Sequence, residues 1–170
     1  MKSNKDNTNN NIYISDSFAG QGVFAAKKFY PGDLILTFSG KRVNSDDPVH
    51  MTELGANLLQ TGYKTYIMPE SPAVFINHSC SPNAGIMKNR KLIAIKKINE
   101  NEEITFDYST TMDEDLWTMQ CLCNEPTCRH IISDFDTLPQ SLKNQYISLN
   151  IVQKFIAHKY KKHYRQMKFL

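Results

Sequence analysis

Short apolar runs that alternate with polar residues fill most of the first two thirds of the chain. Residues 22–43 hold two such runs on either side of Pro31-Gly32-Asp33, a tripeptide typical of a turn. Residues 91–96 (KLIAIK) alternate in the same way, and residues 103–106 form a further run after the turn signal at residues 99–101. The middle of the chain shows no regular period. The pattern therefore predicts several short strands joined by turns and loops.

The period changes near the C-terminal end. Pro139 stands where the first turn of a helix tolerates proline, and Leu142, Tyr146 and Leu149 follow at helical spacing. A second series at helical spacing comprises Val152, Phe155, Ile156, Tyr160 and Tyr164. We expect one or two helices here, so the predicted fold class is mainly β with a C-terminal helical tail.

Length and composition indicate one ordinary globular domain. The chain has 170 residues, of which 41% are hydrophobic and 22% charged, and no internal repeat or linker divides it. No apolar run approaches the roughly 18 residues of a membrane span, which excludes a membrane partner. The asparagine-rich start lacks the apolar core of a secretory signal. We therefore expect a disordered lead-in over residues 1–11 and an intracellular protein of the cytoplasm or the nucleus.

The charge is unevenly distributed. The net charge of +3 does not by itself indicate a nucleic-acid-binding protein. From Lys154 onward, however, six Lys or Arg residues occur without any acidic residue, whereas residues 113–115 (DED) are acidic. The basic end could contact nucleic acid, another acidic partner or a second subunit, or form a solvated helical face. The sequence leaves the oligomeric state open.

The cysteines give the first specific chemistry. The chain has four, and Cys121, Cys123 and Cys128 stand together in the run CLCNEPTC, which leaves Cys80 far upstream. A structural zinc ion takes four ligands, so these four cysteines are predicted to bind one Zn²⁺ that joins two distant segments. Free buried cysteines and a disulfide are the alternatives. The reducing environment inside cells disfavours the disulfide in the intracellular protein that we expect.

Cys80 also ends the stretch FINHSC at residues 75–80, where a thiol follows a histidine by two residues. A catalytic cysteine needs its histidine close in space, and side chains at i and i+2 seldom face each other outside extended chain. A zinc-bound thiolate is no free nucleophile. A thiol-dependent hydrolase is therefore the weaker hypothesis, and His78 alone is typical of a hydrogen-bonded structural histidine.

Several motifs occur in a definite order along the chain: Gly20-Gln21-Gly22, residues 75–84 (FINHSCSPNA), residues 102–109 (EEITFDYS) and residues 121–129 (CLCNEPTCR). In this combination the chain resembles the SET-domain protein methyltransferases with a post-SET zinc segment. The resemblance implies a β-clip-like SET fold of several short sheets with a pseudoknot, which is a rare threaded topology. It also implies a SET domain at residues 12–110, a post-SET segment at 111–135 and a helical extension at 136–170.

The resemblance implies S-adenosylmethionine as the cofactor. Gly20, Gln21, Gly22 and Phe24 would lie against its methionine end, where glycine lets the backbone approach a ligand closely. The family often carries an aromatic residue at the position of Gln21, but the contact is usually made through backbone. The chain has no Rossmann fingerprint, and the two glycines alone would indicate an ordinary turn.

The remaining cofactor residues come from two later segments. Asn77 and His78 match the pair of the family's NHxC motif that binds the methionine part and the adenine. Trp117 and Leu122 stand where post-SET residues cover the adenine in the family. Considered alone, Trp117 could equally be a core anchor.

Three aromatic residues match catalytic positions of the family. Tyr108 matches the catalytic tyrosine, and Phe106 stands where members carry Phe or Tyr. Because Phe leaves room for repeated methylation, we expect a capacity for di- or trimethylation. Tyr66, with Tyr63, could line the lysine channel by aromatic contact with a cation, although core packing explains both equally well. Residues 106–108 also have the pattern of a core strand end.

The resemblance implies a protein-lysine N-methyltransferase acting on a protein that presents a lysine, with histones as one candidate beside other basic proteins. The alternative is a non-catalytic SET-fold protein-binding module, which likeness of fold does not distinguish from an enzyme. The presence of Asn77, His78 and Tyr108 together favours the enzyme. Residues 41–66, which form part of the substrate groove in the family, indicate no particular target.

Overall fold

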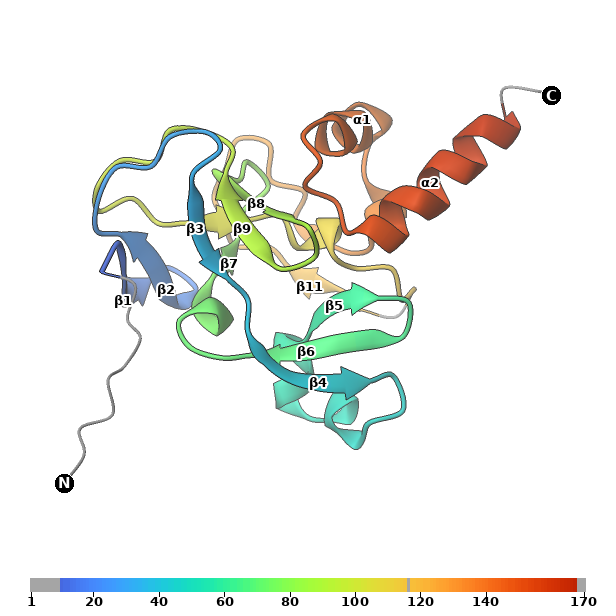
Figure 1. The fold of residues 1–170 in the computed structure, drawn as a ribbon, viewed down its shortest axis with the longest axis horizontal. Helices are drawn as coiled ribbons and strands as arrows, with labels where there is room; N and C mark the ends of the chain where they lie inside the picture. Colours follow the sequence, from blue (N-terminus) through green and yellow to red (C-terminus); the bar gives the residue numbers. More distant parts are fainter. Residues whose placement is uncertain (1–9, 116, 168–170) are drawn as a thin grey trace.

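The computed structural model of the protein describes residues 10–115 and 117–167, with side chains as far as residue 161 (Figure 1). Most of the predicted lead-in, residues 1–9, lies outside the described residues. The first strand, β1, begins at Ile12. Just before it, the carbonyl oxygen of Asn11 accepts a hydrogen bond of 2.8 Å from the backbone N–H of Ala26.

Twelve short strands are found in the described part of the chain: β1 Ile12–Ser17, β2 Gly20–Ala25, β3 Leu34–Thr37, β4 Gly40–Asn44, β5 Leu59–Gly62, β6 Thr65–Pro69, β7 Asn77–His78, β8 Ala84–Met87, β9 Lys91–Ala94, β10 Thr105–Phe106, β11 Met119–Gln120 and β12 Ile131–Ile132. Five short 3₁₀ helices interrupt them: η1 Pro48–Met51, η2 Glu53–Asn57, η3 Ala73–Phe75, η4 Tyr108–Thr110 and η5 Phe135–Thr137. The predicted class, mainly β with several small sheets, is confirmed.

The strands form separate small sheets rather than one large one. β1 and β2 make an antiparallel hairpin, β9 lies between β3 and β8, and β6 lies between β4 and β5. The predicted turn at residues 31–33 separates β2 from β3, and Gly32 adopts φ +97° there, a conformation that favours glycine. The strands predicted in residues 91–96 and 103–106 are β9 and β10.

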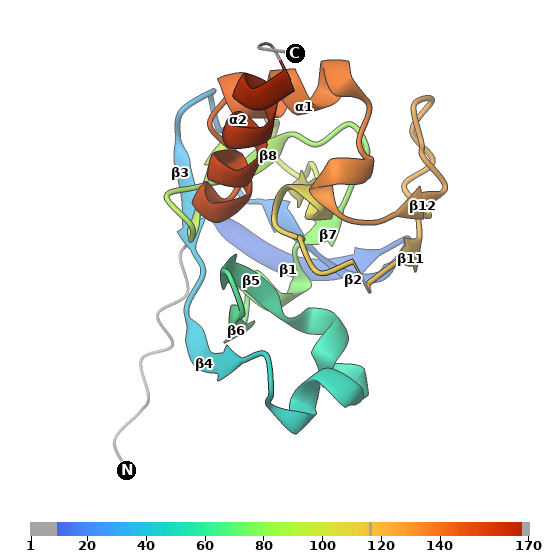
Figure 2. The same cartoon turned by 90° about the vertical axis from the view of Figure 1, so that its right-hand side faces the viewer.

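The irregular middle of the sequence contains more regular structure than its pattern predicts. β4 pairs with β6 from Gly40↔Pro69 to Asn44↔Thr65, and β5 pairs with the other edge of β6. A register shift between Gln60 and Gly62 breaks the alternation of β5, which explains why no period was visible. In Figure 2 this sheet and the neighbouring helices η1 and η2 form the lower part of the molecule.

One parallel pair joins distant parts of the chain. β7 and β10 run side by side in the same direction, with Asn77 opposite Thr105 and His78 opposite Phe106. Parallel neighbours need a long crossover connection, which here contains β8 and β9. The β7–β10 pair places the NHSC segment beside the segment that carries Tyr108. The resemblance predicts the pseudoknot at this NHSC segment.

The main hydrophobic core lies between these sheets. Its buried side chains include Val23, Ile35, Ile67, Leu92 and Ile104. A second cluster, with Phe135, Tyr146, Ile151 and Ile156 among its members, forms under the C-terminal helices. Two smaller clusters lie around Tyr66 and around the cysteines, so the buried hydrophobic residues of the described chain form one main core and several satellite clusters.

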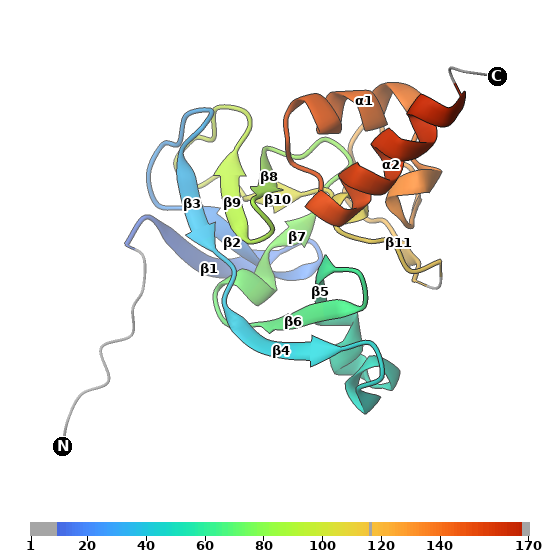
Figure 3. The same ribbon diagram turned by 45° about the vertical axis from the view of Figure 1, so that its right-hand side comes forward.

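The predicted helical tail consists of α1 Gln140–Ser148 and α2 Lys154–Met167, which pack against each other and against the sheet of β8 and β9 (Figure 3). Tyr146 is buried, whereas Leu149, predicted on the same face, is 39% exposed because it caps the C-terminal end of α1. Ile151 packs directly on β8: a Cβ added to Gly85 would lie 2.6 Å from its side chain. Among the described helices, none is both long and apolar enough to cross a membrane.

Candidate functional site

Asn77 brings the predicted cofactor motifs together. Its amide nitrogen donates hydrogen bonds to the backbone carbonyl of Gln21 at 3.0 Å and to Oε1 of Glu103 at 2.7 Å. The hydroxyl of Ser17 lies 3.4 Å from the same nitrogen. Since every one of these contacts uses the amide nitrogen, the amide oxygen of Asn77 remains available to accept a hydrogen bond from a ligand.

Glu103 explains the second glycine of the Gly20-Gln21-Gly22 motif. Oε1 of Glu103 also accepts a hydrogen bond of 2.8 Å from the hydroxyl of Ser17. A Cβ added to Gly22 would lie only 2.3 Å from that carboxylate oxygen. Gly20 adopts φ +100° and has no atom near its missing Cβ. Gly22 is thus needed for space inside the protein and Gly20 for its backbone conformation.

Tyr108 lies at the centre of an aromatic cluster. Its ring centroid is 4.8 Å from that of Phe106, 5.4 Å from that of His78 and 6.3 Å from that of Trp117. Its hydroxyl donates a hydrogen bond of 2.7 Å to the carbonyl oxygen of Ile76. Burial, and secondarily the charge of Glu103, raise the pKa of Tyr108, so the phenol stays neutral near pH 7.

A cavity of about 840 Å³ opens beside this cluster. The predicted catalytic residues Tyr66, Phe106 and Tyr108 all line it. Trp117 and the 73% exposed Tyr63 belong to the same lining. The structure therefore brings residues from β6, β10, η4 and the segment before the cysteines into one concave site, which is the form that ligand sites in proteins usually take.

Three acidic residues that line this cavity, Asp113, Glu114 and Asp115, were not predicted as site residues. Glu114 lies close enough to the buried Tyr66 to influence its hydroxyl, and the ring of His50 packs on Tyr66 with centroids 4.6 Å apart. Burial and the charge of Glu114 raise the pKa of Tyr66. Burial also raises the pKa of Glu114, while the neighbouring Tyr66 lowers it. In the sequence, Glu114 appears only as one member of an acidic run.

The loop that carries Glu114 is held from three sides. The backbone N–H of Asp113 donates to Oε1 of the buried Gln60 at 2.9 Å, and the N–H of Glu114 donates to the carboxylate of Asp134 at 2.7 Å. Nζ of Lys159 in α2 lies 2.7 Å from the carboxylate of Asp113. This wall of the cavity is therefore tied to β5, to Asp134 after β12 and to the helical tail.

The four cysteines meet as predicted. Their sulfur atoms all lie within 4.8 Å of one another, and Sγ of Cys80 is 3.8 Å from Sγ of Cys121. A tetrahedral zinc ion with Zn–S bonds of about 2.3 Å places its sulfurs about 3.8 Å apart. Backbone N–H groups point at two of the sulfurs, from Arg129 to Cys80 and from His130 to Cys128, each at 3.4 Å. The donor set and its geometry fit a structural zinc ion.

His78 and Cys80 are closer than their sequence separation predicts. Nε2 of His78 lies 3.4 Å from Sγ of Cys80, because the chain turns after β7 and folds the thiol back. Nδ1 of His78 accepts the backbone N–H of Tyr108 at 3.2 Å, so Nε2 carries the proton and donates to the sulfur.

Neither His78 nor Cys80 is suited to thiol catalysis. Burial raises the pKa of the metal-free Cys80 thiol to about 11 and lowers the pKa of His78 to about 4. Both residues are buried, and neither lines the cavity. A reactive thiolate needs a lowered pKa and access to substrate. The two side chains are in contact, but the thiol has neither the lowered pKa nor the access to substrate that the hydrolase hypothesis requires.

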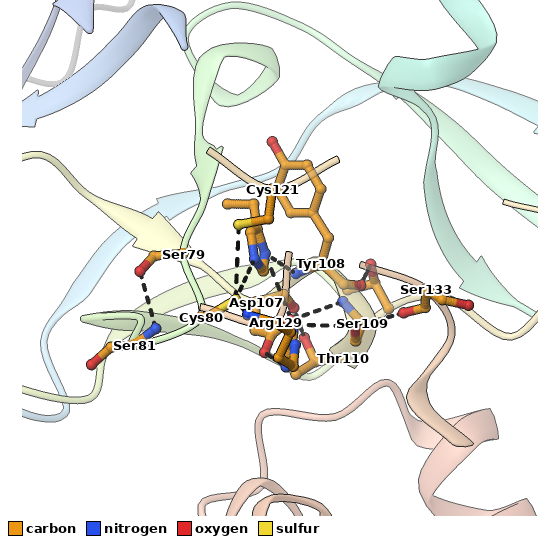
Figure 4. A network of polar contacts seen from close by, with 12 residues as sticks. Ser79, Cys80, Ser81, Asp107, Tyr108, Ser109, Thr110, Cys121, Arg129 and Ser133 are labelled. Carbon is orange, nitrogen blue, oxygen red and sulfur yellow. Dashed lines mark hydrogen bonds and ion pairs between the residues drawn. The ribbon is translucent and has the colours of Figure 1, made fainter. Parts of the chain in front are cut away.

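Asp107, next to Tyr108, is the most heavily bonded side chain near the site (Figure 4). Arg129, which follows the last cysteine, donates two hydrogen bonds to its carboxylate, at 2.7 and 2.8 Å. The hydroxyl of Tyr146 in α1 donates a third at 3.0 Å, and the backbone N–H of Ser109 a fourth at 3.1 Å. The carboxylate is fully buried, and the arginine side chain is 16% exposed. The sequence suggested no role for Asp107, Arg129 or Tyr146 beyond a strand end and a helical core face.

Of the predicted cofactor residues, Tyr108 and Trp117 line the cavity, whereas the following do not: Gly20, Gln21, Gly22, Phe24, Asn77, His78 and Leu122. The ring of Phe24 stacks on Tyr13 across the β1–β2 hairpin, at 5.8 Å between centroids. Leu122 lies on the zinc segment and is 52% exposed. Neither lines the cavity, so their predicted contacts with a cofactor stay predictions.

Comparison with known proteins agrees with this arrangement. Residues 20–109, more than half of the chain, match the SET domain family. The chain is 28% identical over 137 residues to human histone-lysine N-methyltransferase 2D, a match that covers 71% of this chain and 2% of that protein. It is 31% identical over 126 residues to the histone-lysine N-methyltransferase, H3 lysine-36 specific, of Saccharomyces cerevisiae, covering 64% and 17%. It is 37% identical over 65 residues to histone-lysine N-methyltransferase ash1 of Drosophila melanogaster, covering 34% and 3%.

The chain belongs to the SET-domain family. The match covers between 2% and 17% of the lengths of these three relatives, so it concerns a small part of each.

Proposed function

We propose that the protein is a protein-lysine N-methyltransferase that uses S-adenosylmethionine. The observation that carries the proposal is the convergence of Tyr66, Phe106 and Tyr108 on one cavity. Ile76, which also lines the cavity, directly precedes Asn77, whose amide contacts the glycine motif. The names of the relatives, all histone-lysine N-methyltransferases, point to the same reaction.

The residues around Asn77 fit the methionine end of S-adenosylmethionine. That end carries an ammonium and a carboxylate group, and the free amide oxygen of Asn77 is a suitable acceptor for the ammonium. The backbone of Gly20-Gln21-Gly22 lies within hydrogen-bond distance of the same amide. His78, Trp117, Leu122 and Phe24 would complete the site. When bound, the cofactor supplies an electrophilic methyl group on a sulfonium ion.

Tyr108 has the geometry to orient the lysine amine. Because its proton is donated to Ile76, its oxygen can offer lone pairs to the cavity, where they stabilise positive charge around the transferred methyl and align the amine. The phenol does not act as a base, since its raised pKa keeps it protonated. The aromatic walls disfavour the ammonium form of the lysine, which must lose its proton before it attacks.

The four cysteines would hold a structural zinc ion. The ion would fix Cys80, and with it the Asn77-His78 segment, to the chain that carries Trp117. We propose that residues 12–110 form the catalytic domain, residues 111–135 the zinc segment and residues 136–170 a helical extension of the same unit. Tyr108 of the first part and Trp117 of the second line the cavity, and Tyr146 of the third donates a hydrogen bond to Asp107 beside Tyr108.

The relatives make histones the first substrates to test, and a nuclear location accompanies that proposal. Other basic proteins are the alternative. The basic helix α2 was also considered as a nucleic-acid contact. Lys159 of this helix pairs instead with Asp113 of the cavity wall.

The test is methyl transfer from labelled S-adenosylmethionine into histones and into whole-cell protein, followed by location of the modified lysines by mass spectrometry. Tyr108→Phe is expected to lower kcat at least about 100-fold, because alignment at the reacting centre is lost. Tyr30→Phe, at an exposed tyrosine outside the cavity, is the matched control. Cofactor binding without label in any substrate would indicate a non-catalytic binding module, and the absence of cofactor binding would refute the proposal.

A further inference from the structure

The C-terminal extension makes direct contact with the turn that carries Tyr108. The hydroxyl of Tyr146, in α1, is buried and reaches Oδ2 of Asp107 at 3.0 Å. A few residues later, the backbone N–H of Gln153 donates to the carbonyl oxygen of Thr110 at 3.0 Å. Both acceptors lie in or beside η4, the single turn that begins at Tyr108. The extension therefore does more than cover a hydrophobic face.

The Asp107 carboxylate controls the shape of that turn. It accepts the N–H of Ser109 as the N-terminal cap of η4, so its position fixes the backbone on both sides of Tyr108. One of its oxygens, Oδ2, is shared by Nη1 of Arg129 and the hydroxyl of Tyr146. A buried carboxylate is stable only when its lone pairs are satisfied. Arg129 and Tyr146 together hold it in place.

The two donors come from different parts of the chain. Arg129 follows Cys128 in the zinc segment, and Tyr146 belongs to the helical extension. A bidentate arginine–carboxylate pair sets the plane of the carboxylate. The single bond from Tyr146 adds a direction that the arginine does not supply. Burial and the charge of Asp107 raise the pKa of Tyr146, so its hydroxyl remains a donor.

We propose that Tyr146 is a positioning residue for methyl transfer: acting through Asp107, it holds the turn that places the Tyr108 hydroxyl at the cavity. The inference rests on the proposed function, because it assigns Tyr146 a role in the reaction of Tyr108. It makes the helical extension part of the catalytic unit rather than a separate partner-binding tail. Tyr146→Phe is the appropriate variant because it keeps the aromatic ring and removes only the hydroxyl oxygen that bonds Asp107.

The experiment compares Tyr146→Phe with Tyr160→Phe in the full-length protein. Tyr160 lies on α2, and its hydroxyl bonds Asn144 at 3.3 Å, within the helical pair. For Tyr146→Phe we expect kcat to fall about tenfold, with KM for S-adenosylmethionine changed less than about twofold, because a small displacement at the reacting centre affects chemistry more than binding. Tyr160→Phe should retain the wild-type kcat.

A second measurement does not depend on activity. Hydrogen exchange of the backbone amides in residues 107–111, followed by mass spectrometry, should be faster in Tyr146→Phe than in wild type and in Tyr160→Phe. An unchanged kcat together with unchanged exchange would overturn the inference. A proportional loss of kcat and of cofactor binding, with a large fall in Tm, would reduce Tyr146 to a structural role and would overturn it too.

The two proposals can fail separately. If the wild-type protein binds the cofactor but labels no lysine, the proposed function fails and the assignment of Tyr146 to that reaction fails with it. If the wild-type protein is active and Tyr146→Phe matches the control in both measurements, only the inference fails.

Arg129→Lys provides a second variant of the same network, since lysine keeps the charge but cannot donate in bidentate geometry. It should lower kcat in the same way, with zinc content unchanged.

Discussion

The amide nitrogen of Asn77 lies 2.7 Å from Oε1 of Glu103, and this contact sets which end of the amide faces a ligand. With the nitrogen bound to a carboxylate and to the Gln21 carbonyl, the opposite orientation would place the amide oxygen against two acceptors. The Glu103 carboxylate thus orients Asn77 so that its amide oxygen, a hydrogen-bond acceptor, faces the proposed cofactor site.

Replacing that carboxylate by an amide should weaken cofactor binding. In Glu103→Gln the side chain can present either N or O to Asn77, so the orientation of Asn77 is no longer fixed. We expect Kd for S-adenosylmethionine to rise about tenfold, which corresponds to the loss of one hydrogen bond to a charged group. Isothermal titration calorimetry gives Kd directly. The exposed Glu100→Gln is the control, and equal Kd values for the two variants would contradict the assignment.

Removal of metal should unfold the segment after the SET core. We expect a zinc-to-protein ratio near one, which falls to near zero in Cys123→Ser because three ligands hold zinc poorly. A chelator should lower Tm and abolish cofactor binding, since Cys80 and Asn77 belong to one short segment. Elemental analysis and thermal unfolding measure both effects. A chelated protein with unchanged Tm would show that the cysteines are merely buried thiols.

The size of residue 106 should decide how many methyl groups are added. The Phe106 ring lies 4.8 Å from that of Tyr108 and lines the cavity, so a hydroxyl added there takes the space of a methylated amine or of a water molecule. Phe106→Tyr is expected to shift the products from di- and trimethyl-lysine to monomethyl-lysine. Mass spectrometry of the modified peptide gives the distribution. If wild type itself stops at one methyl group, the expectation from Phe106 is wrong.

Glu114 should matter for the lysine substrate rather than for the cofactor. A carboxylate in the cavity wall attracts the ammonium form in which the lysine arrives, before the amine loses its proton for the reaction. Glu114→Gln is expected to raise KM for the lysine peptide about three- to tenfold while KM for S-adenosylmethionine stays the same. Steady-state kinetics with each substrate varied in turn separates the two. Glu125→Gln, on the zinc segment, is a matched control.

The sequence predicted those parts of the site whose chemistry is carried by residue type and local spacing. The number of cysteines equals the number of ligands that a structural zinc ion takes, and the order of the glycine, NHSC and FDY motifs is specific. The helical end was likewise visible, because Pro139 and the spacing of Leu142 and Tyr146 are local signals. The β5–β6 pairing was not visible, because a register shift disturbs its alternation.

The supporting carboxylates could not be predicted, for a physical reason. Asp107, Glu103 and Glu114 are ordinary acidic residues in sequence, and their roles depend on which distant groups meet them. Arg129 and Tyr146 come from elements that the pattern does not place relative to Tyr108. The hydroxyl of a tyrosine on an apolar helix face has no visible partner until the tertiary contacts are known.

The arrangement of the zinc ligands also has a consequence for synthesis of the chain. Cys80 leaves the ribosome well before Cys121, Cys123 and Cys128, since chains emerge from the N-terminal end at about 5–20 residues per second. The proposed metal centre can therefore close only after the whole zinc segment has been made. Until then the Asn77 segment would lack its proposed anchor, so we expect a nascent chain stalled before Cys128 to carry Tyr108 without holding the proposed cofactor.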